Sequence, residues 1–461
     1  MLGNQRLASP VGGSDAPVRL IAPAPTYIVL TLLVAGLLIN SAIVLVALPR
    51  TAGALDYSLK LGDLYDLIAK NLYQGYGYRV EPGMGETMLR EPGYPLLIAA
   101  VFKIRPYSDQ APRVACIVLA FGAALLLLLL TRQITGDRTI GLIAALLFLL
   151  YPATLVSEAR AGNELSCIFT ILASILALYR AVEKGCVWWY GLAGLLLGVG
   201  ALVRGEVLLF PLIILAYLLY TAMGWEERGR TALRMVAFGT GVLVATSPWI
   251  IRNYLLVHKF VPTATLAGVA AQEGLYTCEY LSQYESFRLA QMGAGRERAE
   301  IARQLRLQFV GVQYYQFFYT PQEEVEFNRA LLNRVSREYR GHPGVLVGCA
   351  AKNVLFNFWF LGKTPQATRM NVLVQLPLLA LALGGLIVLY KRGLLRKAAI
   401  IVLYGLYILI MHAIIIAHAR HSMLVVPFLA VPAAVLLARA WHGLRTNYPR
   451  AQPLEIGIRN Y

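Results

Sequence analysis

The sequence predicts an all-α polytopic membrane protein with about ten transmembrane helices. First, 58% of its 461 residues are hydrophobic and only 15% are charged. Second, apolar runs of about 18 to 23 residues recur along the chain, the length that crosses roughly 30 Å of hydrocarbon. Third, much of the basic excess lies in short segments beside these runs. The formal net charge of +17 therefore fits membrane topology and anionic lipid headgroups, and we expect no nucleic-acid binding.

Ten apolar runs are long enough to be membrane-spanning helices. Residues 1–25, before the first run, are longer than the basic region of a cleavable signal peptide, so we expect an uncleaved anchor. The short connections alternate between several basic residues and a single arginine. By the positive-inside rule, segment 1–25 and the tail 442–461 are then cytoplasmic. Within the transmembrane domain, residues 26–441, the expected spans are about 26–48, 111–131, 139–157, 162–181, 187–203, 206–223, 233–251, 371–390, 398–417 and 422–440.

One further apolar segment, residues 344–361, is predicted to be an interfacial or re-entrant helix. It carries Lys352, Asn353 and Asn357, whose side chains cost free energy at the bilayer centre. Counting it as a span would also place the basic cluster at 391–397 outside and reverse every later connection.

Two large loops are expected on the outer face. The first, 50–110, ends in an apolar run at 94–104 that is too short to span and should pack at the interface. The second, 252–370, contains charge-alternating stretches at 296–306 and 323–340, a pattern typical of exposed helices. We find no convincing internal repeat, so the sequence does not support an inverted-repeat transporter.

The five cysteines contain no Cys-x-x-Cys pair, and a disulfide framework is not expected. Cys278 and Cys349 fall on the same side of the predicted membrane, which leaves a pairing between them open. The other three are Cys116, Cys167 and Cys186.

Four arginines are predicted at the same membrane surface: Arg90, Arg204, Arg252 and Arg420. A single arginine at a helix end is explained by snorkelling to the headgroups. Four guanidinium groups on one face, in contrast, form a clamp suited to a phosphate or pyrophosphate. A lipid-linked phosphate is a ligand that is both anionic and membrane-borne.

Three carboxylates precede or open a helix-like run in the first outer loop: Asp56, Asp63 and Asp66. Each has a structural interpretation, because aspartate caps helices and compensates their dipole. A catalytic interpretation is that one of them accepts the proton of an attacking hydroxyl or amine. Glycosyl transfer needs such a base, and phosphate is already a good leaving group when arginines stabilise its charge.

Neither a metal nor a cofactor is expected. His418 and His421 share one helical face, but no third ligand is evident. The sequence holds no phosphate-binding or dinucleotide-binding glycine motif and no nucleophile elbow in a supporting context.

Several motifs in this order resemble a known family. They are Ala-x-Asn-Leu-x-x-Gly-x-Gly-Tyr (Ala69 to Tyr78), Arg-x-Pro-Gly-Tyr-Pro (Arg90 to Pro95), Asn-Glu-Leu (Asn163 to Leu165), Gly-x-x-x-Leu-x-Arg (Gly198 to Arg204), Pro-Trp-Ile-Ile-Arg-Asn-Tyr (Pro248 to Tyr254) and His-x-Arg-His (His418 to His421). The chain, from about residue 26 to 440, resembles the integral membrane glycosyltransferases of the GT-C type. These include the protein O-mannosyltransferases and the aminoarabinose transferase of lipid A.

The resemblance implies an inverting transfer from a polyprenyl-phosphate sugar, with a first-loop aspartate as base. That role falls on Asp63, and contact with the donor phosphate falls on Arg90. In the family the aspartate commonly stands four residues before the tyrosine, a position that Leu61 occupies here, so Asp66 and Asp56 stay open as alternatives. The candidate substrate-binding residues are Arg90, Tyr94, Tyr65, Glu164, Arg204, Arg252, Asn253, Arg420 and His421.

The sequence therefore predicts a glycosyltransferase in the cytoplasmic membrane with its active site on the external face. Its partners would be a polyprenyl-phosphate-linked sugar, membrane lipids, and a lipid, glycan or protein acceptor. The alternative is a transporter or flippase of polyprenyl-linked sugars, which needs polar residues near mid-membrane. A non-catalytic membrane scaffold would not require carboxylates beside arginines.

Overall fold

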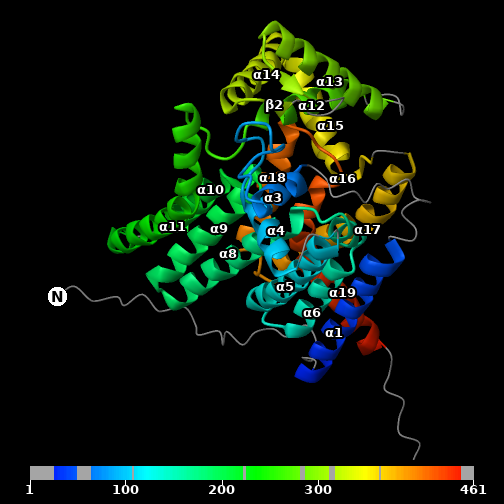
Figure 1. The fold of residues 1–461 in the computed structure, drawn as a ribbon. Helices are drawn as coiled ribbons and strands as arrows, with labels where there is room; N and C mark the ends of the chain where they lie inside the picture. Colours follow the sequence, from blue (N-terminus) through cyan, green and yellow to red (C-terminus); the bar gives the residue numbers. More distant parts are fainter. Residues whose placement is uncertain are drawn as a thin grey trace, which may run out of the picture.

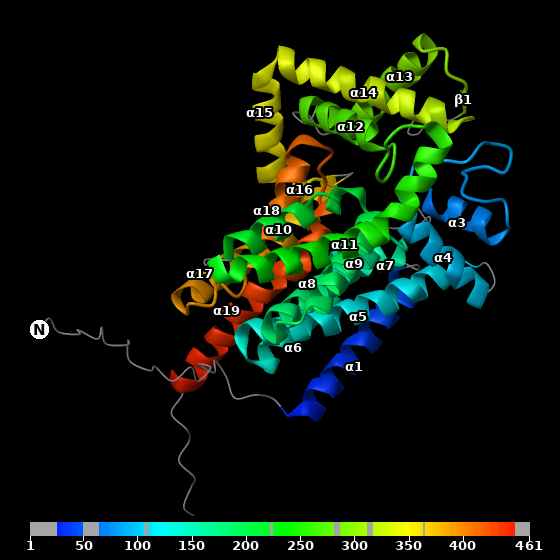
Figure 2. The same ribbon diagram turned by 90° about the vertical axis from the view of Figure 1, so that its left-hand side faces the viewer.

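The protein is a bundle of long helices with a smaller helical domain at one end (Figures 1 and 2). We call the smaller part, residues 267–352, the cap domain. The computed structural model describes residues 25–48, 64–105, 108, 110–221, 225–280, 286–310, 317–362 and 365–447.

The bundle helices coincide with the ten predicted apolar runs, and the all-α class is confirmed. By length and composition, five of the described helices could cross a membrane, or six if the bent pair α6 and α7 is one span. The number of spans therefore stays a prediction. The bundle consists of α1 (Thr26–Ala42), η1 (Ile43–Ala47), α5 (Gln110–Thr135), α6 (Arg138–Leu149), α7 (Pro152–Ala159), α8 (Glu164–Lys184), α9 (Val187–Val203), η2 (Gly205–Val207), α10 (Phe210–Thr221), α11 (Trp225–Val257), α17 (Pro365–Lys391), α18 (Ala399–Ile414), η4 (His421–Leu424) and α19 (Val426–Asn447).

Glycines let the bundle helices approach closely. A Cβ atom at Gly194 of α9 would lie 1.9 Å from the carbonyl oxygen of Phe238 in α11, and one at Gly385 of α17 would lie 1.8 Å from that of Pro432 in α19. Helices in a membrane gain little from hydrophobic burial, so small residues that permit close van der Waals packing matter there.

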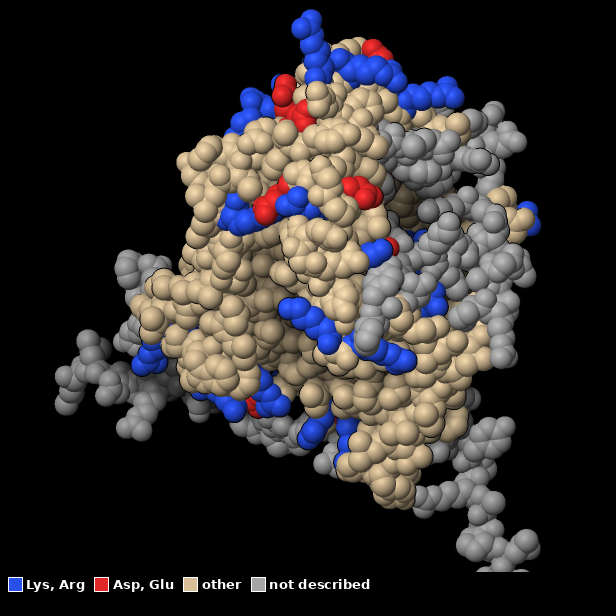
Figure 3. Space-filling view, viewed as in Figure 1, with Lys and Arg blue, Asp and Glu red and all other residues tan. Residues whose placement is uncertain are grey.

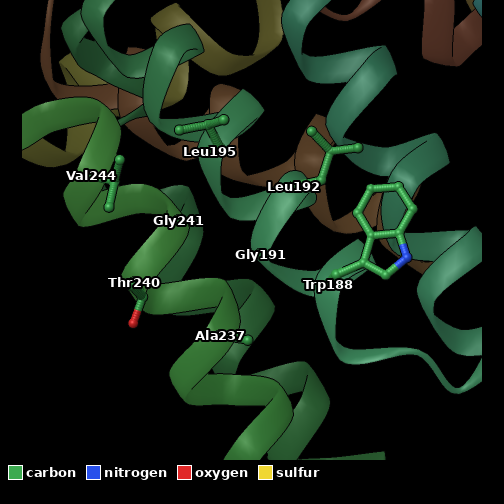
Figure 4. A pocket seen from close by; sticks show the side chains of 8 residues that line it. All are labelled: Trp188, Gly191, Leu192, Leu195, Ala237, Thr240, Gly241 and Val244. Carbon is green, nitrogen blue, oxygen red and sulfur yellow. The ribbon is translucent and has the colours of Figure 1, made fainter.

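A shallow apolar crevice of about 450 Å³ lies between α9 and α11 (Figure 4). It is lined from one side by Trp188 and Leu192, and from the other by Thr240 and Val244. Trp188 and Leu192 belong to the first half of α9, and Thr240 and Val244 lie midway along α11, whereas Arg204 follows the end of α9. The crevice is therefore separate from the candidate site described below.

The cap domain comprises α12 (Ala267–Tyr280), α13 (Ser286–Gln304), the strand pair β1 (Phe309–Val310) and β2 (Phe317–Phe318), α14 (Pro321–Gly341) and α15 (Pro343–Lys352). The strands are antiparallel. Thr320 and Glu323 form a capping box at the start of α14. The two charge-alternating stretches predicted to be helical lie mainly in α13 and in α14. On the face that Figure 3 shows, basic and acidic side chains gather over this domain, while the bundle surface below it is mostly uncharged apart from scattered basic side chains.

Segment 344–361 folds as α15, η3 (Asn353–Asn357) and α16 (Phe358–Phe360). It is not among the described helices long and apolar enough to cross a membrane, and its interfacial or re-entrant placement stays a prediction. The amide of Asn353 donates to the carbonyl oxygen of Ala413 (3.1 Å), and the amide of Asn357 donates to Asn353 (2.8 Å). The polar side chains that argued against a span are thus bound within the protein.

Cys278 of α12 and Cys349 of α15 form a disulfide, the pairing that the sequence left open. The remaining cysteines, Cys116, Cys167 and Cys186, are free. The bond fastens the two ends of the cap domain together, and Lys352 adds a hydrogen bond to the carbonyl oxygen of Cys278 (3.3 Å).

Candidate functional site

The candidate site lies where two short helices of the first loop meet the ends of the bundle helices. These are α3 (Tyr65–Tyr73) and α4 (Gly93–Ile104), and α4 packs against α3, α5 and α9. The predicted interfacial run at 94–104 thus forms a helix, as expected. In Figure 1 both helices lie below the cap domain.

Glu164, the first residue of α8, binds two of the four predicted clamp arginines. Its Oε1 atom accepts from Arg420 Nε at 2.5 Å and from Arg204 Nη1 at 3.4 Å, while Oε2 accepts from the Ser157 hydroxyl at 3.0 Å. The Glu164 side chain is 1% exposed. A carboxylate buried this deeply needs charged partners, and the helix N-terminus also favours its negative charge.

Arg204 is engaged by further partners. It donates from Nε to Glu206 Oε1 at 2.6 Å and from Nη1 to Asn163 Oδ1 at 3.0 Å. His412 Nε2 of α18 lies 3.1 Å from the other oxygen of Glu206. We call Asn163, Glu164, Arg204, Glu206, His412 and Arg420 the Glu164 cluster.

Arg204 is therefore paired with two carboxylates, those of Glu164 and Glu206. The Arg204 side chain is only 12% exposed, whereas the Arg420 side chain is 37% exposed. A phosphate approaching from outside the protein would meet Arg420 more readily than Arg204.

Tyr65 joins the first loop to this cluster. Its hydroxyl donates to Glu91 Oε2 (3.2 Å) and accepts from the Asn163 amide (3.0 Å). The guanidinium carbon of Arg90 lies 5.0 Å from the centre of the Tyr65 ring, and the Tyr94 ring contacts it edge to face. The predicted residues Tyr65, Tyr94 and Arg90 are thus brought beside Glu164, Arg204 and Arg420.

Two of the four residues other than glycine that have a positive φ in the described part of the chain lie at the same place. Leu64, directly before α3, has a φ of 72°, and Ala161, directly before the Gly162–Asn163 turn, has a φ of 49°. Positive φ is uncommon for residues with a Cβ atom and is often kept where function requires it. The Tyr94 hydroxyl donates to the carbonyl oxygen of Ala161, so this strained turn contacts α4.

Arg252 and Asn253 belong to a second group of contacts below the cap domain. Arg252 donates to the carbonyl oxygen of Thr87 and to the Glu86 carboxylate, both at 2.9 Å. The Asn253 amide donates to the carbonyl oxygen of Val261 (2.9 Å) and holds the turn after α11. These contacts give both residues structural partners, and a role in substrate binding stays a prediction.

The base assignment stays a prediction. Asp66 lies in the first turn of α3, where a carboxylate also compensates the helix dipole. Asp56 and Asp63 lie outside the described residues.

His421 stacks on His412, with ring centres 4.6 Å apart. Burial, with the neighbouring histidines and arginines, holds the pKa of His421 well below its usual range. Its neutral ring Nδ1 accepts from the backbone of His418 (3.3 Å). Within the part of the chain that the structure describes, no three His, Cys, Asp or Glu residues are grouped to hold a metal, and the expectation of a metal-free site stays a prediction.

Sequence reasoning missed Glu206 and His412. Glu206 opens the predicted span 206–223, and His412 lies within the predicted span 398–417. Glu206 could have been identified as a carboxylate two residues after Arg204, whereas no neighbouring residue in the sequence indicates a role for His412.

This chain is similar to known proteins in part of its sequence and in its fold. The family model for dolichyl-phosphate-mannose-protein mannosyltransferases matches residues 90–251. The structure of the archaeal oligosaccharyltransferase AglB of Archaeoglobus fulgidus, in complex with an inhibitory peptide and a dolichol-phosphate, aligns with a TM-score of 0.55 at 16% identity, over 94% of this chain and 52% of its own. The apo form of that enzyme aligns with a TM-score of 0.56 at 16% identity, over 95% and 53%.

A third structure, ArnT of Cupriavidus metallidurans bound to undecaprenyl phosphate, aligns with a TM-score of 0.39 at 14% identity, over 94% of this chain and 82% of its own. Comparison with curated proteins finds no match. The chain spans about half the length of the archaeal enzyme. The resemblance to the integral membrane glycosyltransferases of the GT-C type is confirmed.

Proposed function

We propose that this protein is an inverting glycosyltransferase that moves a sugar from a polyprenyl-phosphate carrier to a lipid, glycan or protein acceptor. One observation carries the proposal: Arg204 and Arg420 meet on Glu164, beside Tyr65 and Arg90 of the first loop. The ends of separate helices thus assemble a charged and polar site, in which arginines and carboxylates are paired, at one end of an otherwise apolar bundle. The archaeal complex with dolichol-phosphate supports a lipid phosphate as the class of donor.

The arrangement fits a single displacement at the anomeric carbon. The acceptor oxygen or nitrogen forms a bond to that carbon, the bond from the carbon to the phosphate oxygen breaks, and a first-loop aspartate takes the acceptor's proton. Arg420 and Arg90 would stabilise the charge left on the phosphate. Glu164 and Glu206 would orient the arginines and keep a buried positive charge paired.

We place the site at the outer face of the cytoplasmic membrane. The Cys278–Cys349 disulfide supports this side, because disulfides form and persist in oxidising compartments. The cap domain that carries the disulfide contacts the first loop, as the hydrogen bond from Gly85 to the carbonyl oxygen of Tyr319 (3.1 Å) shows.

A transfer assay with purified protein and radiolabelled polyprenyl-phosphate sugars tests the function. We expect Asp63→Asn to lower turnover by roughly 10² to 10⁴ with donor binding nearly intact, because the amide keeps the shape but cannot take the proton. Asp66→Asn and Asp56→Asn are the matched variants. A large loss in one of them, with Asp63→Asn near normal, would move the role of base to that residue. Label that crosses vesicles without reaching any acceptor would instead favour a flippase.

A further inference from the structure

Glu324 of α14 fastens the cap domain to the first loop just before the candidate site. Its side chain is buried, and each of its oxygens accepts a hydrogen bond from the loop. Oε1 accepts from the Thr87 hydroxyl at 2.5 Å, and Oε2 accepts from the backbone N–H of Met88 at 2.8 Å. The hydroxyl of Thr265, which precedes α12, also donates to Oε2 at 3.3 Å.

Residues 87–89 also bind partners outside the cap domain. Arg252 of α11 donates to the carbonyl oxygen of Thr87 (2.9 Å). The backbone N–H of Thr265 donates to the carbonyl oxygen of Met88 (2.9 Å). The N–H of Leu89 donates back to the Thr87 hydroxyl (3.0 Å). The polar groups of residues 87–89 thus bind partners from both the bundle and the cap domain.

The next two residues belong to the candidate site. Arg90 lies over the Tyr65 ring, and Glu91 accepts from the Tyr65 hydroxyl and from the N–H of Gly205 (3.0 Å). Arg90 and Glu91 follow residues 87–89 directly, with no intervening segment to absorb a shift. A displacement of residues 87–89 would therefore move Arg90 relative to Arg204 and Arg420.

We propose that Glu324 is a positioning residue: it couples the cap domain to residues 87–89 and thereby places Arg90 for the lipid phosphate. The inference rests on the proposed function, since it gives Arg90 a phosphate to bind. Glu324 acts through the loop backbone and need not touch the substrate. Any acceptor that moves the cap domain would then also move a donor-binding residue.

In the variant Glu324→Ala, we expect two measured quantities to change together. The exchange rate of the Met88 amide hydrogen should rise at least tenfold, because its acceptor is gone. The affinity for undecaprenyl phosphate, used as the probe, should fall about tenfold, because Arg90 is no longer held. Glu324→Gln should recover most of the protection of the Met88 amide and most of the affinity for undecaprenyl phosphate. The glutamine carbonyl oxygen can accept from the Met88 N–H, and its amide group can donate to the Thr87 hydroxyl.

Glu326→Ala is the matched control, because Glu326 lies exposed on the same helix. It should leave both quantities within twofold of the wild type. If Glu324→Ala fails to fold, Thr87→Val removes the same 2.5 Å contact from the loop side and should raise Met88 exchange and weaken binding.

The experiment comprises amide hydrogen exchange and undecaprenyl phosphate binding for the full-length chain. Unchanged Met88 exchange in Glu324→Ala would overturn the coupling, and faster exchange with unchanged affinity would overturn the positioning role. A wild-type protein that binds no undecaprenyl phosphate would count against the proposed function instead, while the exchange data would still show whether Glu324 holds the loop.

Discussion

Glu164 illustrates how residues far apart in the chain combine at this site. Its carboxylate accepts from Arg204, 40 residues later, and from Arg420, 256 residues later. Breaking a buried ion pair costs about 3 to 5 kcal/mol, because the remaining charge loses its partner. The partial exposure of Arg420 lowers the cost on that side. Local motifs indicated each residue, but the pairing is a property of the fold.

The arginines are expected to differ in their contribution to donor binding. Arg420→Ala should weaken undecaprenyl phosphate binding by about 1.5 to 3 kcal/mol, as for a charged hydrogen bond, and Arg420→Lys should recover only part, because lysine lacks the planar fork. Arg252→Lys should weaken binding less than Arg420→Ala does, because the partners of Arg252 in the structure are Glu86 and Thr87 and a lysine can still bind one of them. Isothermal titration of these variants gives the comparison. Full recovery by Arg420→Lys would remove Arg420 from the phosphate contact.

The predicted site was partly accessible from sequence for a physical reason. Arg204, Glu164 and Arg420 stand out because charges beside apolar runs are rare. Glu206 and His412 do not, because their meaning depends on a contact between residues 206 positions apart in the sequence. The partners of Arg252 could not be predicted either, since Glu86 and Thr87 reach it only when the cap domain and the first loop have folded.

At the scale of elements, the predicted span 139–157 proved to be two helices. The helices α6 and α7 meet at a bend of 51° between Leu149 and Pro152. A hydropathy pattern alone does not distinguish such a pair from one continuous helix. Pro152 nevertheless indicates the start of a new helix, because proline lacks an N–H and fits the first helical turn. The segment 344–361 divides in a comparable way, into α15, η3 and α16.

The contact between α14 and the first loop should depend on pH. Burial raises the pKa of Glu324 to about 7, against 4.5 for the exposed group, while the hydrogen bonds from the loop and the charge of Arg252, itself paired with Glu86, oppose the rise. The docked carboxyl therefore holds more protons than the undocked one between these values. Docking should be strongest below pH 4.5, weaken by about 3 kcal/mol as pH rises to 7, and level off above it.

The protection factor of the Met88 amide, followed from pH 5 to 8, measures this dependence. Glu324→Gln cannot ionise and should give a nearly flat profile. An equal slope in that variant would assign the pH dependence to another group.

At the scale of the whole molecule, the basic connections predict the orientation. A reporter fused after Arg396 should be cytoplasmic, and one fused after Gly362 should be external, because α17 lies between them and carries an apolar stretch long enough to cross. Paired alkaline phosphatase and fluorescent protein fusions distinguish the sides. Finding both positions on one side would show that α17 does not span, and finding both in the cytoplasm would also contradict the external placement of Gly362.

The long separation between Glu164 and Arg420 also constrains how the protein is made. At roughly 5 to 20 residues per second, a ribosome takes about 13 to 51 s to add the 256 residues between them. During that interval Arg204 is the one of these two arginine partners that has already been synthesised. The site is therefore complete only after Arg420 has been added and the segment around it has packed against α8, long after the early helices have been made.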